Sequence, residues 1–229
     1  MCIQIEDFQK LKNDAHKAFV EKLTPCGIPS LGIKVPLIKQ FAKKIQPTYE
    51  MLETIPLNEY IEQDILYGFL LNQLGKVKDN QYDYYMEKYV ASMANWMTVD
   101  TFVSNTTFQK DEQERLYRYI QKWLKSEKEF IVRTGVVMIK KYFIQQKDFD
   151  EIFELLSTIS YGPYYIDMAV AWLLCSMACL DFTYIYAHLI DVHKWSEFVY
   201  KKAIQKMRES YLINKAQKEM LSSVLIFQH

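Results

Sequence analysis

Residues 60–75 read YIEQDILYGFLLNQLG, and apolar side chains return through this run at steps of three and four residues. Such steps place side chains on one side of an α-helix, whereas a half-buried strand would alternate polar and apolar residues. Gly75 stands where the run ends, which is a common position for the residue that follows a helix. The run therefore predicts a helix with a broad apolar stripe, made by Tyr60, Ile61, Asp64, Ile65, Tyr67, Gly68, Leu71 and Leu74.

The same periodicity continues along most of the chain, and no segment shows the alternation of a strand. Residues that break helices are concentrated at the start, because five of the six prolines and two of the six glycines precede residue 57. Helices are expected over residues 4–23, 35–46, 58–75, 79–93, 95–105, 110–125, 128–146, 149–160, 164–179, 183–190, 197–211 and 215–226.

About a dozen helices joined by short turns can form either a compact bundle or a solenoid of antiparallel helical pairs. From residue 58 onward, successive pairs are spaced by roughly 30 to 40 residues, which is near the period of HEAT-type repeats. The predicted fold is therefore all-α, a right-handed curved α-α superhelix of HEAT-like antiparallel pairs. It would form a single helical-repeat domain over 1–229, with proline- and glycine-containing helices in 1–57 and helical pairs in 58–229.

Composition limits the classes of function. The chain has 229 residues, and its 50% hydrophobic content excludes a disordered protein. The longest apolar stretch, Met168–Leu180, is shorter than the roughly 20 residues that a membrane span needs, and the N-terminus lacks the basic segment of a signal peptide. A cytoplasmic protein without a membrane partner is expected. Lys and Arg together equal Asp and Glu at 28 each, so any basic surface must be local.

Cysteine and histidine do not indicate a metal or redox centre. The four cysteines, Cys2, Cys26, Cys175 and Cys179, do not suggest a disulfide framework, and we expect Cys175 and Cys179 to be packed in an apolar helix. His188 and His193 lack the spacing of zinc ligands on a helix. The chain also has no glycine-rich phosphate loop or nucleophile elbow, so neither a metal nor a cofactor is expected.

Trp96 and Asp100, in the sequence Asn95-Trp96-Met97-Thr98-Val99-Asp100, are the first candidates for chemistry. Four residues apart on a helix, they would present a flat aromatic surface beside a negative charge. Such a pair can act on a cation. Further along, Ser126-Glu127-Lys128-Glu129 predicts a capping box that opens the helix carrying Arg133.

Four segments in this order resemble the AlkD-like family of bacterial DNA alkylation repair proteins, over about residues 8 to 221. They are GIKVPLIKQFAK at 32–43, WMTVD at 96–100, FIVR at 130–133 and YYIDMAVAW at 164–172. The resemblance implies a HEAT-like helical solenoid and a monofunctional N-glycosylase that removes cationic N3- and N7-alkylated purines from duplex DNA. It also implies that Asp100 carries the chemistry, flanked by Trp96 and Trp172, with Arg133 nearby.

Each of these residue types suits its implied role. An alkylated purine that already carries a positive charge leaves without being protonated, so the enzyme must stabilise the cation that grows on the deoxyribose. One carboxylate near the anomeric carbon does this electrostatically and can orient the attacking water. Tryptophans would pack on the backbone or on the cationic base, and an arginine would hold a phosphate by paired hydrogen bonds.

The chain departs from the family pattern around the second tryptophan. Asp167 and Met168 precede Trp172 and Leu173–Ser176 follow it, where DNA-binding members have polar and basic residues, and position 97 is Met. Fewer cations would then face the phosphates, which weakens nonspecific binding. Compensation is expected from cations on later helices, although they can equally be solvated helix faces: Lys122, Lys125, Lys128, Lys140, Lys141, Lys201, Lys202, Lys206 and Arg208.

Two functions therefore stay open at the level of sequence. The first is an alkylpurine DNA glycosylase, expected to be a monomer, and it is favoured by the presence of all four site residues. The second is a catalytically silent scaffold that binds DNA or a protein through its concave face, and zero net charge and Asp167 favour it. In that second case the tryptophans would be core residues and Arg133 a structural partner of Glu129.

Overall fold

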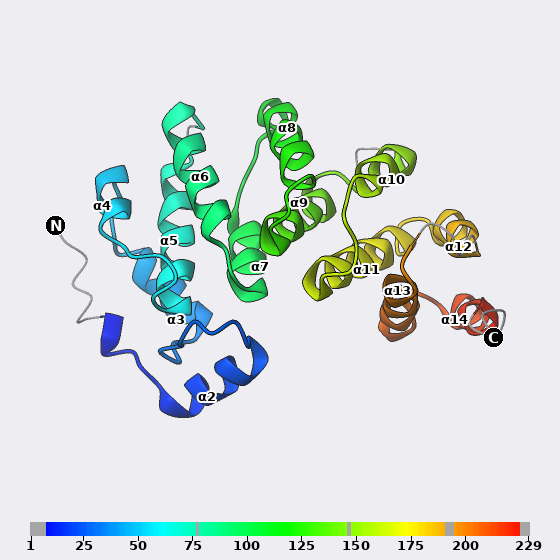
Figure 1. Cartoon of the computed structure of the whole chain (residues 1–229), viewed down its shortest axis with the longest axis horizontal. Helices are drawn as coiled ribbons and strands as arrows, with labels where there is room; N and C mark the ends of the chain where they lie inside the picture. Colours follow the sequence, from blue (N-terminus) through cyan, green and yellow to red (C-terminus); the bar gives the residue numbers. More distant parts are fainter. Residues whose placement is uncertain (1–7, 77, 146–147, 191–194, 225–229) are drawn as a thin grey trace. The chain divides into compact units, whose positions relative to one another are not determined.

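The computed structural model describes residues 8–76, 78–145, 148–190 and 195–224, and within those ranges the helices are joined by loops and turns, with no strand (Figure 1). The predicted all-α fold is confirmed, while the right-handed sense of the superhelix stays a prediction. None of the helices in the described ranges has the length and hydropathy needed to cross a membrane. The chain divides into two compact units, residues 1–114 and 115–229.

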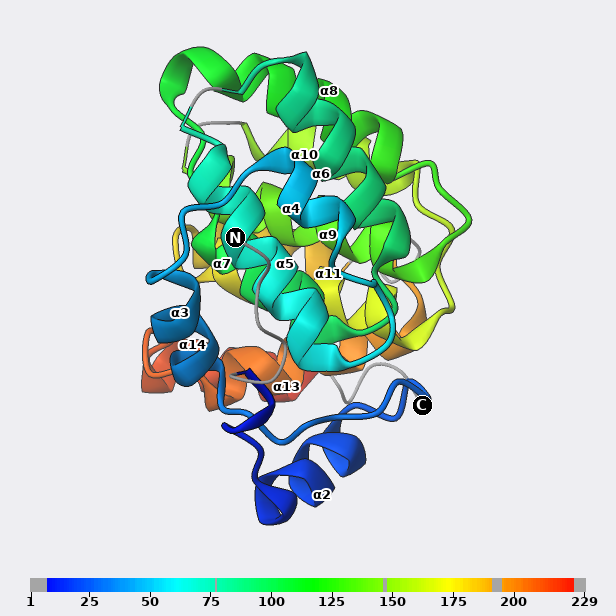
Figure 2. The ribbon, with the colours of Figure 1, turned by 90° about the vertical axis from the view of Figure 1, so that its left-hand side faces the viewer.

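The first unit is built around one buried helix. Its helices are α2 (Asp14–Leu23), α3 (Val35–Ala42), α4 (Tyr49–Glu53), α5 (Ile61–Leu74), α6 (Asn80–Ser92) and α7 (Trp96–Asn105), followed by the 3₁₀ helix η1 (Lys110–Glu112). Helix α5 packs against α3, α4, α6 and α7, and Figure 2 shows this unit facing the viewer. This position explains why every residue from Ile61 to Leu71 is buried, including those outside the predicted apolar stripe.

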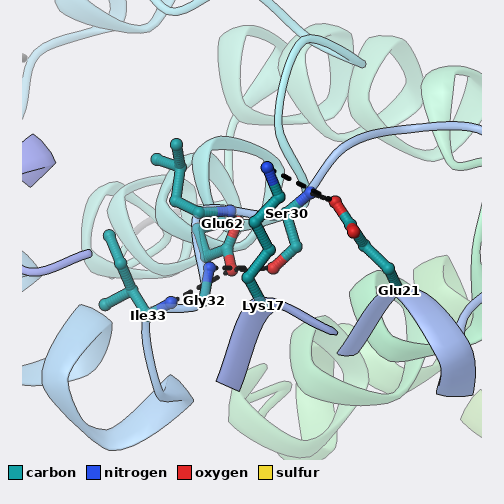
Figure 3. Close-up of polar contacts among 7 residues, drawn as sticks. Lys17, Glu21, Ser30, Gly32, Ile33 and Glu62 are labelled. Atoms are coloured by element: carbon teal, nitrogen blue, oxygen red, sulfur yellow. Dashed lines mark hydrogen bonds and ion pairs between the residues drawn. The ribbon is translucent and has the colours of Figure 1, made fainter. Parts of the chain in front are cut away.

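Polar residues inside α5 tie it to the loop that precedes α3 (Figure 3). The buried carboxylate of Glu62 accepts hydrogen bonds from Ser30 Oγ (2.6 Å), Leu31 N (2.8 Å) and Ile33 N (3.2 Å). Gly32 lies in the same loop at φ +72°, and a Cβ atom there would come within 2.0 Å of the Asn13 carbonyl oxygen. The loop therefore requires glycine at this position, and Glu62 satisfies two of the loop's backbone donors, Leu31 N and Ile33 N.

The second unit contains two layers of helices. They are α8 (Gln113–Trp123, which begins at the end of the first unit), α9 (Glu129–Tyr142), α10 (Phe149–Ser157), α11 (Tyr164–Ala178), α12 (Phe182–Ile190), α13 (Glu197–Glu209) and α14 (Lys215–Val224). Helix α11 packs against α9 and α13 in one layer, and α10 and α12 lie in the other (Figure 1). This arrangement agrees with the predicted helical pairs, because α12 must run back antiparallel to return the chain to the layer that holds α11 and α13.

Contacts at both ends show that α11 and α13 run in the same direction. Near their first turns, Ser196 Oγ donates to Asp167 Oδ2 (3.3 Å), and at their last turns Cys179 Sγ lies 3.5 Å from Ser210 Oγ. Parallel neighbours separated by one returning helix are the expected unit of a helical solenoid.

The predicted helix ranges are close to the observed ones, with three differences. The expected helix 4–23 is interrupted at residues 10–13, and residues 1–7 lie outside the described part of the chain. Helix α4 was not expected, because Pro47 and Pro56 flank a segment of only five helical residues. The segment 110–125 begins as a 3₁₀ turn rather than as α-helix.

The predicted capping box before Arg133 is wrong. Helix α9 has Lys128 as its N-cap residue without a side-chain cap, and Ser126 Oγ instead accepts from Lys128 N (3.1 Å). Glu129 is consequently the first residue of the helix rather than the third. Its carboxylate accepts a hydrogen bond from the backbone N–H of Tyr165 in α11 instead of capping α9.

Candidate functional site

Trp96 and Asp100 lie one turn apart on α7, and both side chains are partly exposed. The helix begins at Trp96 because Asn95 caps it: the Asn95 Oδ1 atom accepts from Thr98 N (2.9 Å) and from Thr98 Oγ1 (3.1 Å). The buried Asn95 therefore fixes the register in which Trp96 and Asp100 leave the helix.

The Trp96 ring has a second constraint within the first unit. Its Nε1 atom donates to the carbonyl oxygen of Leu23 (3.3 Å), the last residue of α2. This bond occupies the polar edge of the indole and leaves the apolar ring partly exposed, one helical turn from Asp100. An aromatic surface held in this way is suited to stacking or to contact with a cation.

Arg133 is buried in α9, with 6% of its surface exposed. Its Nη1 atom donates to the carbonyl oxygen of Tyr165 (3.0 Å), while Glu129 Oε1 accepts from the backbone N–H of the same residue (2.6 Å). Tyr165 is in the first turn of α11, whose N-cap is Pro163 and has no side-chain cap. The pair Glu129 and Arg133 therefore holds both polar groups of one backbone position and supplies α11 with a cap from a neighbouring helix.

Trp172 lies on α11 two turns after Tyr165 and is partly exposed. The Lys140 ammonium of α9 lies 3.8 Å from the centre of its ring. A cation this close to a tryptophan face is attracted by about 0.5 to 2 kcal/mol, depending on how far water is excluded. Sequence reasoning named both residues but not their contact, because they are 32 positions apart on different helices.

Asp167 does not face solvent, contrary to the expectation that it would reduce DNA binding. Its side chain is buried, and it accepts hydrogen bonds from Gly162 N (3.1 Å) and Ser196 Oγ (3.3 Å). It therefore connects the start of α11 to the start of α13. Leu173, Leu174 and Cys175 are buried as well, so the apolar residues after Trp172 belong to the core.

The packing predicted for the cysteines of α11 is found at Cys175, which is buried with a free thiol. Burial raises the pKa of this thiol to about 12, and the nearby ammonium groups of Lys206 and Lys140 act in the opposite direction. At neutral pH the thiol is therefore protonated and unreactive. Cys2 and His193 lie outside the described residues.

The nine predicted DNA-binding cations belong to the second unit. Lys122 and Lys125 are exposed at the end of α8 and Lys128 just before α9, whereas Lys140 and Lys141 are in the last turn of α9. Lys201, Lys202, Lys206 and Arg208 are on α13. Some of these cations have local partners: Lys201 forms an ion pair with Glu197 one turn away, and Lys202 Nζ donates to Gln205 Oε1 (3.0 Å).

Charge is distributed unevenly between the two units. Residues 1–114 hold 12 basic and 16 acidic residues, a net charge of −4, and residues 115–229 hold 16 basic and 12 acidic residues, a net charge of +4. The zero net charge of the whole chain therefore hides a basic unit. Nonspecific attraction to a polyanion depends on this local excess rather than on the total.

A family model described as DNA alkylation repair enzyme matches residues 4–207. The chain belongs to this family. The match confirms the resemblance seen in the four segments, and it covers both units and all four predicted site residues. No curated protein matches the chain. Membership in the DNA alkylation repair family indicates a role in repairing alkylated DNA and makes DNA the expected partner.

The structure places the four site residues in two groups. Trp96 and Asp100 are together on α7 of the first unit, and Arg133 and Trp172 are on the adjacent helices α9 and α11 of the second. The convergence of all four on one concave cleft, expected from the resemblance, stays a prediction.

Proposed function

We propose that this DNA alkylation repair family member is an N-glycosylase that releases cationic N3- and N7-alkylated purines from duplex DNA. The observation that carries the proposal is the partly exposed pair Trp96 and Asp100, set in register by the buried cap Asn95. Asp100 stabilises the positive charge that develops on the deoxyribose as the base leaves and orients the attacking water. Trp96 contacts the sugar or the cationic base, and no cofactor is required for this reaction.

Trp172 and the basic second unit hold the duplex in this proposal. The net charge of +4 in residues 115–229 and the burial of Asp167 both support contact with phosphates. Arg133, whose Nη1 atom donates to the Tyr165 carbonyl oxygen, is proposed to contact a phosphate through the same guanidinium group.

A scaffold without catalytic activity is the second candidate, and the burial of Arg133 favours it. In that function the Glu129 and Arg133 contacts with Tyr165 serve only to join α9 to α11. DNA or a protein would bind through the predicted concave face, and no base would be released.

Base release from N7-methylguanine DNA distinguishes the two candidates. Asp100→Asn should slow release at least about a hundredfold, because it keeps the shape of the side chain and removes a charge that contributes several kcal/mol to the transition state. Trp172→Ala should cost less. The matched control is Asp111→Asn, which removes an exposed carboxylate from η1 of the same unit. Release no faster than the spontaneous rate by the parent protein would establish the scaffold, and an active Asn variant would refute the carboxylate mechanism.

A further inference from the structure

Helices α9, α11 and α13 share a register that can be followed from contact to contact. At their first turns, Glu129 of α9 bonds to Tyr165 of α11, and Asp167 of α11 bonds to Ser196 of α13. Further along, Lys140 in the last turn of α9 lies over the Trp172 ring of α11, and at the far end Cys179 of α11 lies beside Ser210 of α13. The three helices therefore run side by side in one direction.

This register brings two lysines to the same level of α11. Lys140 follows Glu129 by eleven residues, as Ser176 follows Tyr165, which is about 16 Å along each helix. Lys206 precedes Ser210 by four residues, as Cys175 precedes Cys179. Both lysines thus lie level with the turn of α11 that follows Trp172, one on each side of it.

A cation–π contact and an electrostatic effect relate these lysines to that turn. Lys140 Nζ lies over the Trp172 ring, and the charges of both Lys206 and Lys140 act to lower the pKa of the Cys175 thiol. Because burial keeps this thiol neutral, Cys175 adds no negative charge near the two lysines. Contact with the ring also restricts the long Lys140 side chain, so it loses less conformational freedom when it binds an anion.

We propose that Lys140 and Lys206 form a binding site for the phosphates of a DNA backbone across α11, with Trp172 as the platform that positions Lys140. The site rests on the proposed function in taking duplex DNA as its ligand. It also changes the role of Trp172, since one face of the ring holds a lysine of the protein itself rather than the alkylated base. Trp172 is in this sense a positioning residue.

Binding of an undamaged, labelled duplex by anisotropy at several salt concentrations tests the site. Lys140→Met and Lys206→Met should each lower the slope of log K against log salt by about 0.9 and weaken binding about threefold or more at moderate salt. Lys140→Arg should keep the slope of the parent protein. The matched control is Lys215→Met, which removes an exposed charge from α14 of the same unit.

The platform role of Trp172 has its own readout. Trp172→Leu should weaken binding about as much as Lys140→Met, and the double variant should be little weaker than either, because both remove the same positioned cation. A purely structural role would lower the melting temperature without changing the salt slope.

Several outcomes would overturn the proposal. Equal effects of Lys140→Met and Lys215→Met would mean that only net charge matters, and additive effects of Trp172→Leu and Lys140→Met would remove the platform role. Absence of duplex binding by the parent protein would refute the site itself. Because the duplex is undamaged, failure of base release alone refutes the glycosylase and leaves this site standing.

Discussion

Asp64 shows how one buried residue couples the stability of the first unit to pH. The side chain lies inside α5 and accepts a hydrogen bond from Asn58 N (2.8 Å). Burial raises its pKa from 3.8 to about 7, with a further contribution from the neighbouring Glu62 carboxylate, although the Asn58 bond acts in the opposite direction. The acid is therefore protonated in the folded protein at pH values where it is ionised in the unfolded chain.

A folded state that binds more protons than the unfolded state loses stability as pH rises. For Asp64 the loss should occur between about pH 4 and pH 7 and amount to several kcal/mol, because each unit of pKa shift corresponds to about 1.4 kcal/mol. Asp64→Asn keeps an acceptor for Asn58 N, so it should flatten this dependence and raise the melting temperature at pH 8. Urea unfolding at pH 4, 6 and 8 measures the free energy of unfolding, with Asp111→Asn as the exposed control. The same dependence of this free energy on pH in the parent and in Asp64→Asn would contradict the expectation.

At the scale of elements, the junction of α9 and α11 depends on two side chains that bind one backbone position. Glu129→Ala should destabilise the protein by about 1 to 2 kcal/mol, since it leaves the Tyr165 N–H of α11 without its acceptor. Glu127→Ala, which removes an exposed carboxylate two residues earlier, should have little effect. Chemical denaturation of the two variants gives the comparison, and equal midpoints would show that the contact contributes nothing.

Arg133→Met separates the two roles considered for this arginine. If the guanidinium only joins the helices, the variant should lose about 2 to 3 kcal/mol of stability while the salt dependence of duplex binding stays unchanged. If the guanidinium also holds a phosphate, as in the proposed function, the slope of log K against log salt should fall by about 0.9 as well. We expect both the loss of stability and the smaller salt slope. A variant with the stability and the salt slope of the parent would argue against both roles.

The bounds of a helix were predictable from the sequence where the apolar periodicity and the helix-breaking residues agree. They were less predictable where a contact with a residue distant in sequence sets the end of the helix. The bounds of α7, α11 and α13 follow from runs of apolar residues and from caps such as Asn95 and Ser196. The capping box at Ser126 failed because the start of α9 is set by packing, which leaves Glu129 to cap another helix. The contact of Lys140 with Trp172 leaves no local signal, since it depends on the register of two helices.

At the scale of the whole molecule, the two units that hold the predicted site residues carry opposite net charges. The proposed catalytic carboxylate Asp100 belongs to a unit of net charge −4, while the cations that would hold phosphates belong to a unit of net charge +4. A strongly basic surface around Asp100 would favour nonspecific binding along undamaged DNA. Placing the cations in the other unit lets attraction to the backbone and stabilisation of the sugar cation come from different parts of the chain.

If both units bind one duplex, DNA should protect the backbone amides of both units from hydrogen exchange at the same DNA concentration. Hydrogen exchange during titration with an undamaged duplex should slow in α7 and in α9, α11 and α13 at the same DNA concentration. Raising the salt should move both midpoints by the same factor, because a single binding event rests on phosphate contacts. Lys140→Met should shift the midpoint in α7 as well, even though the lysine belongs to the other unit.

Helix α6 of the first unit, which carries none of the predicted site residues, provides the internal reference for this experiment. Protection limited to the second unit would mean that Asp100 does not meet the duplex that Lys140 and Lys206 hold, and the four site residues would then not form one cleft. Midpoints that differ between the units would indicate two independent ligands. Coincident midpoints with coincident salt dependence are the result expected of a single repair site, because one duplex must then contact Asp100 and the lysines of the second unit at once.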